Sequence, residues 1–361
     1  MKKALILLLS LGMVLCFIGC GSSDDTEEAT ATDTYEVAMV TDIGTIDDKS
    51  FNQGTWEGVE EFAMDNDLTY KYYQPTEDST DARMEQIDLA VENGAKVIAT
   101  PGFLFEDTIF LAQDKYPEVK FILIDGNPHN ADYTEYKTGD NAVGVTFAEQ
   151  EAGYLAGYAA VKEGYTKLGF MGGMAVPAVV RYGYGFVQGA NDAAAEMDVE
   201  VDMKYHYTGG FSASPDIQTK AAGWYAAGTE VIFSCGGGIF SSISAAAESS
   251  EAYVIGVDVD QSSQSDTVIT SSMKGLKEAV VKALEAYKND EFPGGEAWVL
   301  GAKDDAVGLP METSLFETFT QEDYDAIFAK LVAGEIEISV DTDVDSASDI
   351  DAGNVIVDLV E

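Results

Sequence analysis

The chain has 361 residues, which is enough for two ordinary domains built around separate cores. Its 64 Asp and Glu residues against 20 Lys and Arg residues give a formal net charge of −44 at pH 7. Because this charge would repel the phosphates of nucleic acids and of anionic lipid surfaces, the composition argues against both as partners of the folded body.

The N-terminus has the pattern of an export signal. Lys2 and Lys3 precede the apolar run ALILLLSLGMVLCFIG, which is too short for a comfortable membrane span. The run ends in FIGC, and the polar string GSSDDTEEATATDT follows, an order that resembles a bacterial lipobox. We therefore predict a signal peptide over 1–19, a lipid on the thiol of Cys20, and a flexible tether over 20–34.

Phe17 stands where a lipobox usually carries leucine or another aliphatic residue, so a plain secretory signal is the alternative to a lipoprotein signal.

The number and position of the cysteines agree with the predicted lipid anchor. Cys16 would leave with the signal, and Cys235 would be the only free thiol left in the mature chain. One cysteine with His129 and His206 cannot build a zinc site, and the apolar run EVIF before Cys235 predicts a buried side chain rather than a nucleophile.

From Tyr35 onward, short apolar runs rich in β-branched residues alternate with amphipathic helical stretches. In the first series we predict strands at 35–42, 96–102, 119–126 and 141–147, and helices at 50–66, 79–94 and 104–117. In the second series we predict helices at 149–164, 179–197 and 216–228, and strands at 167–173, 201–210, 230–238 and 253–260. Strands separated by helices indicate parallel sheets with helices on both faces, so the chain is predicted to form two doubly wound α/β lobes.

Ligands of open parallel sheets bind beyond the carboxyl ends of the strands, and three acids stand at such ends: Asp42, Asp125 and Asp258. Ionised carboxylates only accept hydrogen bonds, so they suit a neutral ligand rich in O–H and N–H donors. Phe51 and Phe211 could offer flat faces to a stacked ring. Acceptors and aromatic faces together favour a nucleoside or sugar site. The alternative for each acid is a turn or helix cap, and for each phenylalanine it is core packing.

Polar residues at the start of the first helix have competing roles. Ser50 and Gln53 form the S-x-x-Q pattern of a capping box. Asp47 and Asp48 are expected to be loop charges that cap the same helix. Lys274, in VITSSMKG, either donates to a ligand hydroxyl or is an ordinary surface lysine.

Two other motifs fail on their spacing. The segment DTDVDSASDID (341–351) has acids at alternate positions but carries Ser346 and Ala352 where a calcium loop needs glycine and glutamate. We expect it to be a solvated acidic tail. The glycines at 236–238 lack the Lys-Ser/Thr pair of a P-loop.

Taken in order, the motifs resemble those of the basic membrane protein (BMP) lipoproteins, the purine-nucleoside-binding components of ABC transporters. The resemblance runs from about Tyr35 to about Asp305. It rests on the segments TDIGTIDDKSFNQGTWEG, FILIDG, VGVTFAEQEAGYLAGYAA, GFMGGMAVPAVVRYGYGFVQGA, YTGGF, EVIFSCGGG, VIGVDVDQ and ITSSMKG.

The resemblance implies a fold like that of type I periplasmic binding proteins, with two lobes joined by a hinge that close over the ligand. We expect the N-terminal lobe to comprise 35–145 with about 272–292, and the C-terminal lobe to comprise 146–271 with about 293–320. A C-terminal helix and acidic tail are expected over 321–361.

The resemblance also implies which residues hold the base. Asp42 and Asp125 would accept hydrogen bonds from it, and Phe51 and Phe211 would sandwich the purine. Asn52, beside Phe51, is a further candidate.

On the sugar side, Asp258 or Asp260 would hold the ribose hydroxyls together with Lys274. Ile43 stands where some family members have a polar contact to the base, so we expect this position to influence the choice among purines.

The resemblance therefore implies a monomeric, lipid-anchored receptor on the extracytoplasmic face of the cell membrane. It would bind inosine, guanosine or adenosine and deliver them to a permease, without catalysis, cofactor or metal. A binding protein for a sugar or furanose signal is one alternative. An extracellular nucleoside hydrolase is another, although no histidine, cysteine or metal cluster accompanies the carboxylates.

Overall fold

The computed structural model describes residues 34–360. The predicted signal peptide, the predicted lipidation site at Cys20 and the tether up to residue 33 lie outside the described residues. None of the helices within 34–360 is both long and apolar enough to cross a membrane.

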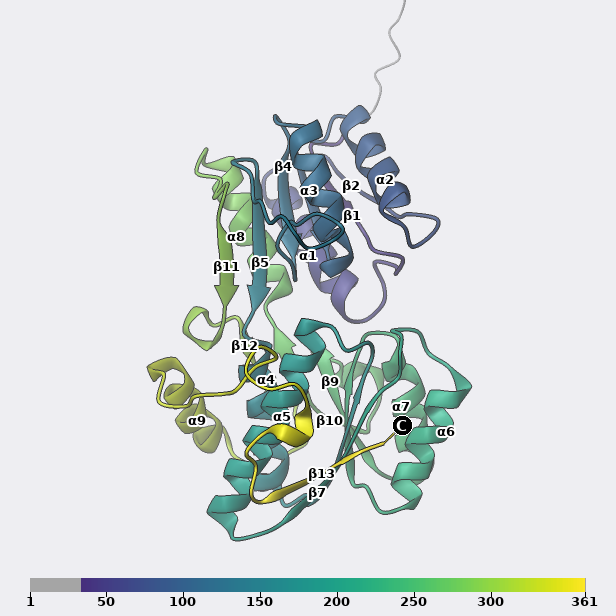
Figure 1. Cartoon of the computed structure of the whole chain (residues 1–361), viewed down its shortest axis with the longest axis vertical. Helices are drawn as coiled ribbons and strands as arrows, with labels where there is room; N and C mark the ends of the chain where they lie inside the picture. Colours follow the sequence, from purple (N-terminus) through teal and green to yellow (C-terminus); the bar gives the residue numbers. More distant parts are fainter. Residues whose placement is uncertain (1–33, 361) are drawn as a thin grey trace, which may run out of the picture. The chain divides into compact units, whose positions relative to one another are not determined.

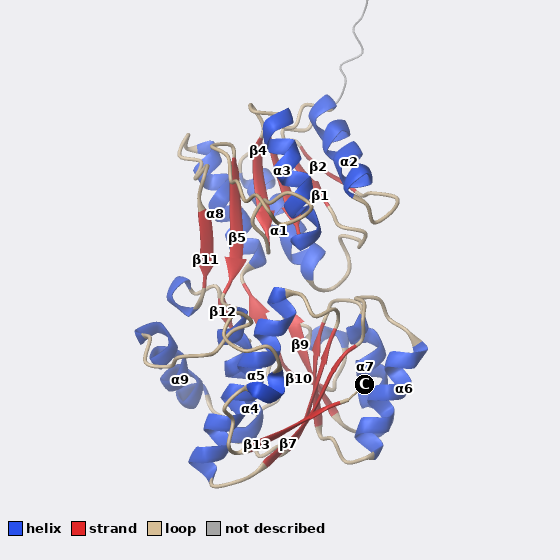
Figure 2. Cartoon of the chain, in the orientation of Figure 1, coloured by secondary structure: helices blue, strands red, loops and turns tan. Residues whose placement is uncertain are grey.

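The first lobe is built on a six-stranded sheet in the order β11-β5-β4-β3-β1-β2, with every pair parallel (Figures 1 and 2). Its strands are β1 (Val37–Val40), β2 (Tyr70–Tyr73), β3 (Val97–Pro101), β4 (Lys120–Ile124), β5 (Ala142–Phe147) and β11 (Ala297–Leu300). Its helices are α1 (Phe51–Asp65), α2 (Thr80–Glu92), α3 (Glu106–Lys115) and α8 (Leu276–Lys288).

Alternation along the strands places a core on each face of this sheet. Val37 and Met39 of β1 pack with α1 and α8, whereas Ala38 and Val40 pack with α2 and α3. All four side chains are fully buried, as expected of a parallel strand covered on both faces.

The second lobe is built on a seven-stranded sheet in the order β12-β10-β9-β8-β6-β7-β13, in which only β12 is antiparallel to its neighbour. Its strands are β6 (Lys167–Gly172), β7 (Val201–Tyr207), β8 (Val231–Cys235), β9 (Tyr253–Asp258), β10 (Val268–Lys274), β12 (Val307–Gly308) and β13 (Val355–Leu359). Its helices are α4 (Glu149–Glu163), α5 (Pro177–Met197), α6 (Pro215–Ala226), α7 (Ile239–Ser250) and α9 (Gln321–Ala333).

The two sheets share one winding order. In the first sheet β1 has β2 on one side and β3, β4 and β5 in succession on the other. In the second sheet β6 likewise has β7 on one side and β8, β9 and β10 in succession on the other. The strand order therefore reverses between β1 and β3 in the first sheet and between β6 and β8 in the second. These two positions are the switch points at which open α/β sheets bind ligands. The predicted pair of doubly wound lobes is confirmed.

The chain passes between the lobes three times, at about 147–149, 274–276 and 300–302. The last crossing differs from the expected boundary, which places all of 293–320 in the C-terminal lobe. Instead, β11 pairs with β5 in the first sheet. This short edge strand is half-exposed, with Val299 68% accessible, so its sequence pattern does not reveal which sheet it joins.

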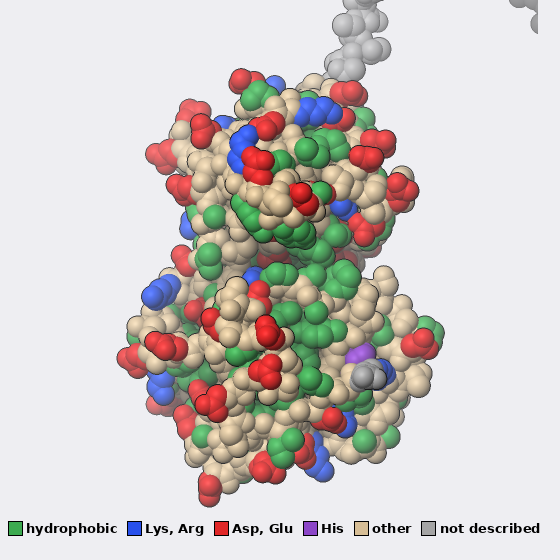
Figure 3. All heavy atoms as spheres, viewed as in Figure 1, with side chains coloured by type: hydrophobic (Ala, Val, Ile, Leu, Met, Phe, Trp, Pro, Cys, Tyr) green, Lys and Arg blue, Asp and Glu red, His purple; other side chains and the backbone are tan. Residues whose placement is uncertain are grey.

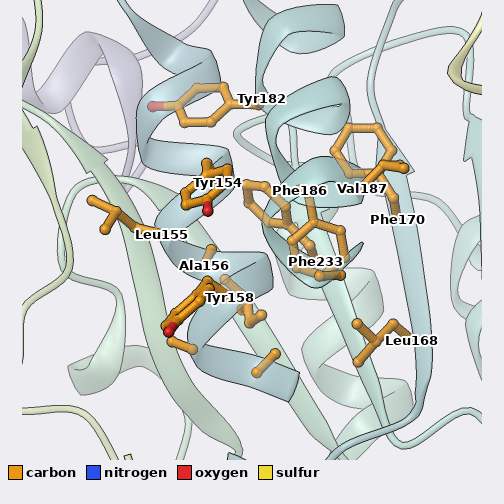
Figure 4. Packing of buried hydrophobic residues seen from close by; sticks show 14 of the residues in the cluster. Tyr154, Leu155, Ala156, Tyr158, Leu168, Phe170, Tyr182, Phe186, Val187 and Phe233 are labelled. Atoms are coloured by element: carbon orange, nitrogen blue, oxygen red, sulfur yellow. The ribbon is translucent and has the colours of Figure 1, made fainter. Parts of the chain in front are cut away.

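Helices α4 and α5 of the second lobe pack backbone to backbone. A Cβ added to Gly153 or Gly157 of α4, or to Gly185 or Gly189 of α5, would lie 1.9–2.1 Å from a backbone oxygen of the other helix. Aromatic side chains of the lobe core fill the space around this contact (Figure 4). The glycines thus bring the first turns of both helices together at the end of the lobe that carries the crossing at 147–149.

The C-terminal segment is more ordered than the expected solvated tail. Most aspartates between 341 and 351 are exposed, but Ala347 and Ile350 are buried and β13 extends the second sheet beside β7. The expectation of a solvated tail follows from the acids of this segment, whereas the apolar residues between and after them anchor it to the lobe.

Candidate ligand-binding site

Phe51 lies at the switch point of the first sheet. It begins α1, and a Cβ on Gly102, the residue after β3, would lie 3.4 Å from its ring. Asp42 follows β1 on the other side of the same switch point. The predicted acid and the predicted ring therefore share one end of the first sheet.

Phe211 lies at the corresponding position of the second sheet. Its ring covers Gly173, where an added Cβ would be 2.4 Å away, and Gly173 in turn contacts Gly236 after β8. The ring also borders a cavity of about 410 Å³ lined by residues of the loop 208–212 and the start of α6. Each predicted stacking residue thus lies on a glycine at the switch point of its own lobe.

The ammonium of Lys274, at the end of β10, joins the two lobes. It forms an ion pair with Asp125 at the end of β4 in the first lobe, and it lies 3.5 Å from Oδ1 of Asp258 at the end of β9 in the second. Its Nζ also lies 4.7 Å from the centre of the Phe51 ring. The Lys274 side chain is only 3% exposed, so it is not an ordinary surface lysine.

The two acids paired with Lys274 share an unusual backbone. Asp125 has φ 57° and Asp258 has φ 68°, in the left-handed region that L-residues rarely adopt. Such a conformation costs about 1–3 kcal/mol and persists only where the surrounding structure imposes it, most often at functional sites. The strand ends therefore hold both carboxylates in place against a local preference.

Burial and neighbouring charge set the protonation of this cluster. Burial raises the pKa of Asp125, the ammonium of Lys274 lowers it, and the charges of Glu149 and Asp258 raise it, so that the resulting pKa is about 6. Burial lowers the pKa of Lys274, but the three carboxylates around it outweigh that effect and the pKa lies above its ordinary value. Lys274 therefore remains charged at neutral pH.

The start of α1 corrects one prediction and confirms another. Ser50 makes no capping hydrogen bond with its side chain, and its Oγ donates instead to Oδ2 of Asp258 across the lobes at 2.6 Å. The predicted capping box is therefore wrong, because the Ser50 hydroxyl is used as a donor to a buried carboxylate. Of the two acids predicted to cap the helix, Asp48 does so, since its carboxylate accepts the backbone N–H groups of Ser50, Asn52 and Gln53 at 2.9–3.0 Å. The prediction is wrong for Asp47, whose carboxylate accepts from Oγ1 of Thr45 instead.

Asp42 and Asn52 form a pair beside this cap. Oδ1 of Asp42 accepts from the Gly44 N–H at 2.5 Å and from Nδ2 of Asn52 at 3.0 Å. The same Asn52 amide donates to Asp48. Burial raises the pKa of Asp42. Asn52 thus orients Asp42, and the neighbouring Ile43 side chain is 49% exposed.

The remaining candidates lie apart from the Lys274 cluster. Asp260 accepts from the Ser262 N–H at 2.9 Å and from Oγ1 of Thr313 at 2.7 Å, so both of its oxygens serve local structure. Phe211 makes no ring contact with Phe51 within the described part of the chain. The structure gathers Phe51, Asp125, Asp258 and Lys274, with Asp42 and Asn52 joined to each other.

Sequence reasoning missed three residues next to this cluster: Glu149, Arg181 and Tyr182. Glu149 is fully buried and accepts from Nε of Arg181 at 2.6 Å. Arg181 and Tyr182 belong to a segment that was interpreted only as a helix. The available signal was a basic side chain inside an otherwise apolar and small-residue stretch, PAVVRYGYGF.

The charged and aromatic side chains gathered here can accept and donate hydrogen bonds and offer a ring for stacking. Among residues 34–360, the His, Cys, Asp and Glu side chains form no cluster that could hold a metal ion. Cys235 is buried as predicted, and burial raises its pKa well above the ordinary value. Acidic side chains are scattered over the visible face of both lobes, in keeping with the net charge (Figure 3).

The sequence of the chain is similar to those of known proteins. Residues 35–342 match the Bmp family, described as "ABC transporter substrate-binding protein PnrA-like". The chain is 30% identical over 344 residues to the ABC transporter nucleoside-binding protein BmpA of Lactococcus lactis, covering 88% of this chain and 94% of that protein. It is 29% identical over 340 residues to basic membrane protein A1 of Borrelia garinii, covering 92% and 95%.

The fold has solved counterparts. An ABC transporter solute-binding protein from Aeropyrum pernix K1 superimposes with a TM-score of 0.72 at 24% identity, covering 87% of this chain and 95% of that one. The two lobes therefore share the fold of that solute-binding protein.

Proposed function

This chain belongs to the Bmp family of PnrA-like ABC transporter substrate-binding proteins, and from that membership we propose that it captures purine nucleosides between its lobes and passes them to a permease. The ligand would be carried unchanged, by lobe closure about the three crossings. The Lactococcus relative named as nucleoside-binding supports this ligand class.

The observation that carries the proposal is the placement of rings and acceptors at equivalent ends of the two sheets. Phe51 and Phe211 lie at the two switch points, where closure would bring a ring from each lobe toward one ligand. Asp42 and Asp125 offer acceptors for the N–H groups of a base, and Asp258 with Lys274 offers an acceptor and a donor for hydroxyls.

We further propose that the protein is held at the extracytoplasmic face by a lipid on Cys20. The lipobox-like segment and the polar tether support this location, and so does the extracytoplasmic, membrane-associated role of the family. Palmitate labelling of cells expressing the chain should label it, and Cys20→Ser should abolish the label.

Calorimetric titration of the mature protein tests the ligand. We expect inosine, guanosine or adenosine to bind tightly and to raise the melting temperature. Absence of both heat and stabilisation with all three would refute the proposal. The same mixtures should release no free base over hours, and multiple turnover would show that the protein is a hydrolase.

Variants of the rings separate a nucleoside from a simple sugar. Phe51→Ala and Phe211→Ala should each weaken nucleoside binding by about tenfold or more, because stacking contributes about 0.5–1.5 kcal/mol beyond burial and the ring area is lost as well. Phe110→Ala, a half-buried phenylalanine on α3, is the control. Unchanged affinity in both ring variants would remove the purine sandwich and favour a sugar.

A further inference from the structure

Two buried side chains beside Lys274 carry polar atoms without a protein partner. Glu149 is 0% exposed and uses Oε2 to accept from Arg181, while its Oε1 has no hydrogen-bond partner among residues 34–360. Tyr182 is 1% exposed, and its hydroxyl likewise lacks a partner in the described chain.

Both residues belong to the Lys274 cluster. The centre of the Tyr182 ring lies 5.7 Å from Nζ of Lys274. The Glu149 charge raises the pKa of both Lys274 and Asp125, and the Asp258 charge, after burial, raises that of Tyr182. The two side chains therefore share the surroundings of residues expected to hold the sugar.

The fold fixes these side chains firmly. Glu149 is the first residue of α4, and Tyr182 lies in the second turn of α5, beyond Tyr154 along the helix pair (Figure 4). The close glycine contact of α4 with α5 leaves neither helix free to shift. Arg181 holds Oε2 of Glu149 and lies 3.6 Å from Asp341 on its other side.

Packing alone does not account for the unpaired atoms. Nearly all buried polar atoms in proteins find a partner, and one left without a partner is costly. A phenylalanine at 182 would fill the same space without that cost. A neutral phenol that both donates and accepts, in the same charged cluster as a carboxylate that accepts, matches an alcohol group.

We propose that Glu149 and Tyr182 are ligand-contacting residues that bind a sugar hydroxyl of the nucleoside, with Arg181 as the positioning residue for Glu149. This inference rests on the proposed function. It assigns to the second lobe's helix pair a part of the site beyond the acids, lysine and rings described above.

Titration of inosine and its 2′-, 3′- and 5′-deoxy analogues tests the inference. Tyr182→Phe should weaken inosine binding by about five- to tenfold, and Glu149→Gln by more, since hydrogen bonds to charged groups are stronger. For the analogue that lacks the contacted hydroxyl, each variant should bind as the wild type does. The ligand-free Tyr182→Phe protein should melt at the same temperature as the wild type or higher.

Tyr154→Phe is the matched control. Tyr154 is equally buried on α4, but its hydroxyl donates to Asp192 at 2.8 Å. This variant should bind all four nucleosides as the wild type does.

The possible outcomes separate failure of this inference from failure of the proposed nucleoside-binding function. If wild type binds inosine and both variants bind it equally well, the inference is overturned and the nucleoside function stands. An equal loss for all four ligands with a lower melting temperature would assign both residues a structural role and also overturn it. If wild type binds no nucleoside, the proposed function fails and the inference fails with it.

Discussion

At the level of single residues, Asp48 and Asp125 have identical side chains but different roles. Asp48 lies in the loop before α1 and accepts three backbone N–H groups. Asp125 is buried against Lys274 and keeps one oxygen without a partner in the described chain. Surroundings rather than residue type decide which of them stabilises the fold and which is available to a ligand.

Replacing Asp48 should destabilise the protein. Asp48→Ala leaves three N–H groups at the start of α1 without their acceptor, and we expect a loss of about 1–2 kcal/mol in the free energy of unfolding. Asp47→Ala is the control, because among residues 34–360 its carboxylate accepts from Oγ1 of Thr45 and not from the N–H groups that begin α1. Urea unfolding of both variants provides the measurement, and equal losses would contradict the capping role.

Affinity for nucleosides should depend on pH through Asp125. Its pKa of about 6 means that it takes up a proton between pH 7 and pH 5, facing Lys274, Glu149 and Asp258. A protonated carboxyl is a poorer acceptor, so affinity should fall as pH drops through about 6, by at most about tenfold per pH unit. Titrations from pH 5 to pH 8 should show this fall in wild type, and Asp125→Asn should show a flat profile.

The stability of the ligand-free protein should fall as pH rises, whereas its affinity for nucleosides should rise. The pKa of Asp125 is higher in the folded protein than the ordinary value of 3.8, so the folded state binds the proton more tightly. The Asp125 contribution to the free energy of unfolding therefore decreases as pH rises from about 4 to about 6 and is constant above. A difference between wild type and Asp125→Asn that does not vary over this range would rule out the assigned pKa.

At the scale of elements, the contact between α4 and α5 organises the second lobe. It places Glu149 at the start of one helix and Arg181 with Tyr182 near the start of the other. Four glycines allow this approach, so no side chain separates the two backbones. The positions of these three side chains therefore depend on four glycines that make no polar side-chain contact themselves.

Adding one methyl group at the contact between α4 and α5 should strongly destabilise the protein. In Gly189→Ala the new Cβ would lie 1.9 Å from the carbonyl oxygen of Tyr154, which forces the helices apart. We expect a loss of about 3 kcal/mol or more, at the upper end of overpacking effects. Gly223→Ala in α6, where an added Cβ meets nothing within 4 Å, should be neutral or stabilising by up to about 1 kcal/mol. Thermal unfolding distinguishes the two.

At the scale of the whole described chain, one winding order occurs twice and the C-terminal segment completes the second copy. The family match ends at residue 342, and η4 (Ala347–Asp349) and β13 lie beyond it. The segment pairs with β7 and borders a cavity of about 480 Å³ lined in part by Tyr184, Tyr205 and Tyr207. It is therefore part of the lobe rather than an appendage.

Truncation after Thr342 should weaken the second lobe. It removes the buried side chains of Ala347, Ile350 and Val355, and burying one large aliphatic side chain is worth about 1.5–3 kcal/mol. We expect calorimetry to show that the free energy of unfolding of the truncated protein is lower by about 2 kcal/mol or more. Ile356→Ser, at a position 53% exposed, should change stability by less than about 0.5 kcal/mol. An unchanged melting temperature after truncation would show that the segment only rests on the lobe.

The sequence alone predicts two doubly wound lobes and the candidate acids at the strand ends. Both follow from local properties, namely the period of apolar residues along each element and the residue at which each strand stops. These properties also predicted the burial of Cys235 and the capping by Asp48, since neither depends on distant contacts.

Contacts between distant parts of the chain, in contrast, become visible in the folded protein alone. Lys274 and Asp125 lie 149 residues apart, and Ser50 and Asp258 lie 208 apart. Their contacts arise because three crossings bring the ends of two sheets together. The sheet joined by β11 and the position of Glu149 and Tyr182 depend likewise on edge pairing and on a glycine contact between helices. Such contacts depend on how whole elements pack, and no local pattern specifies that packing.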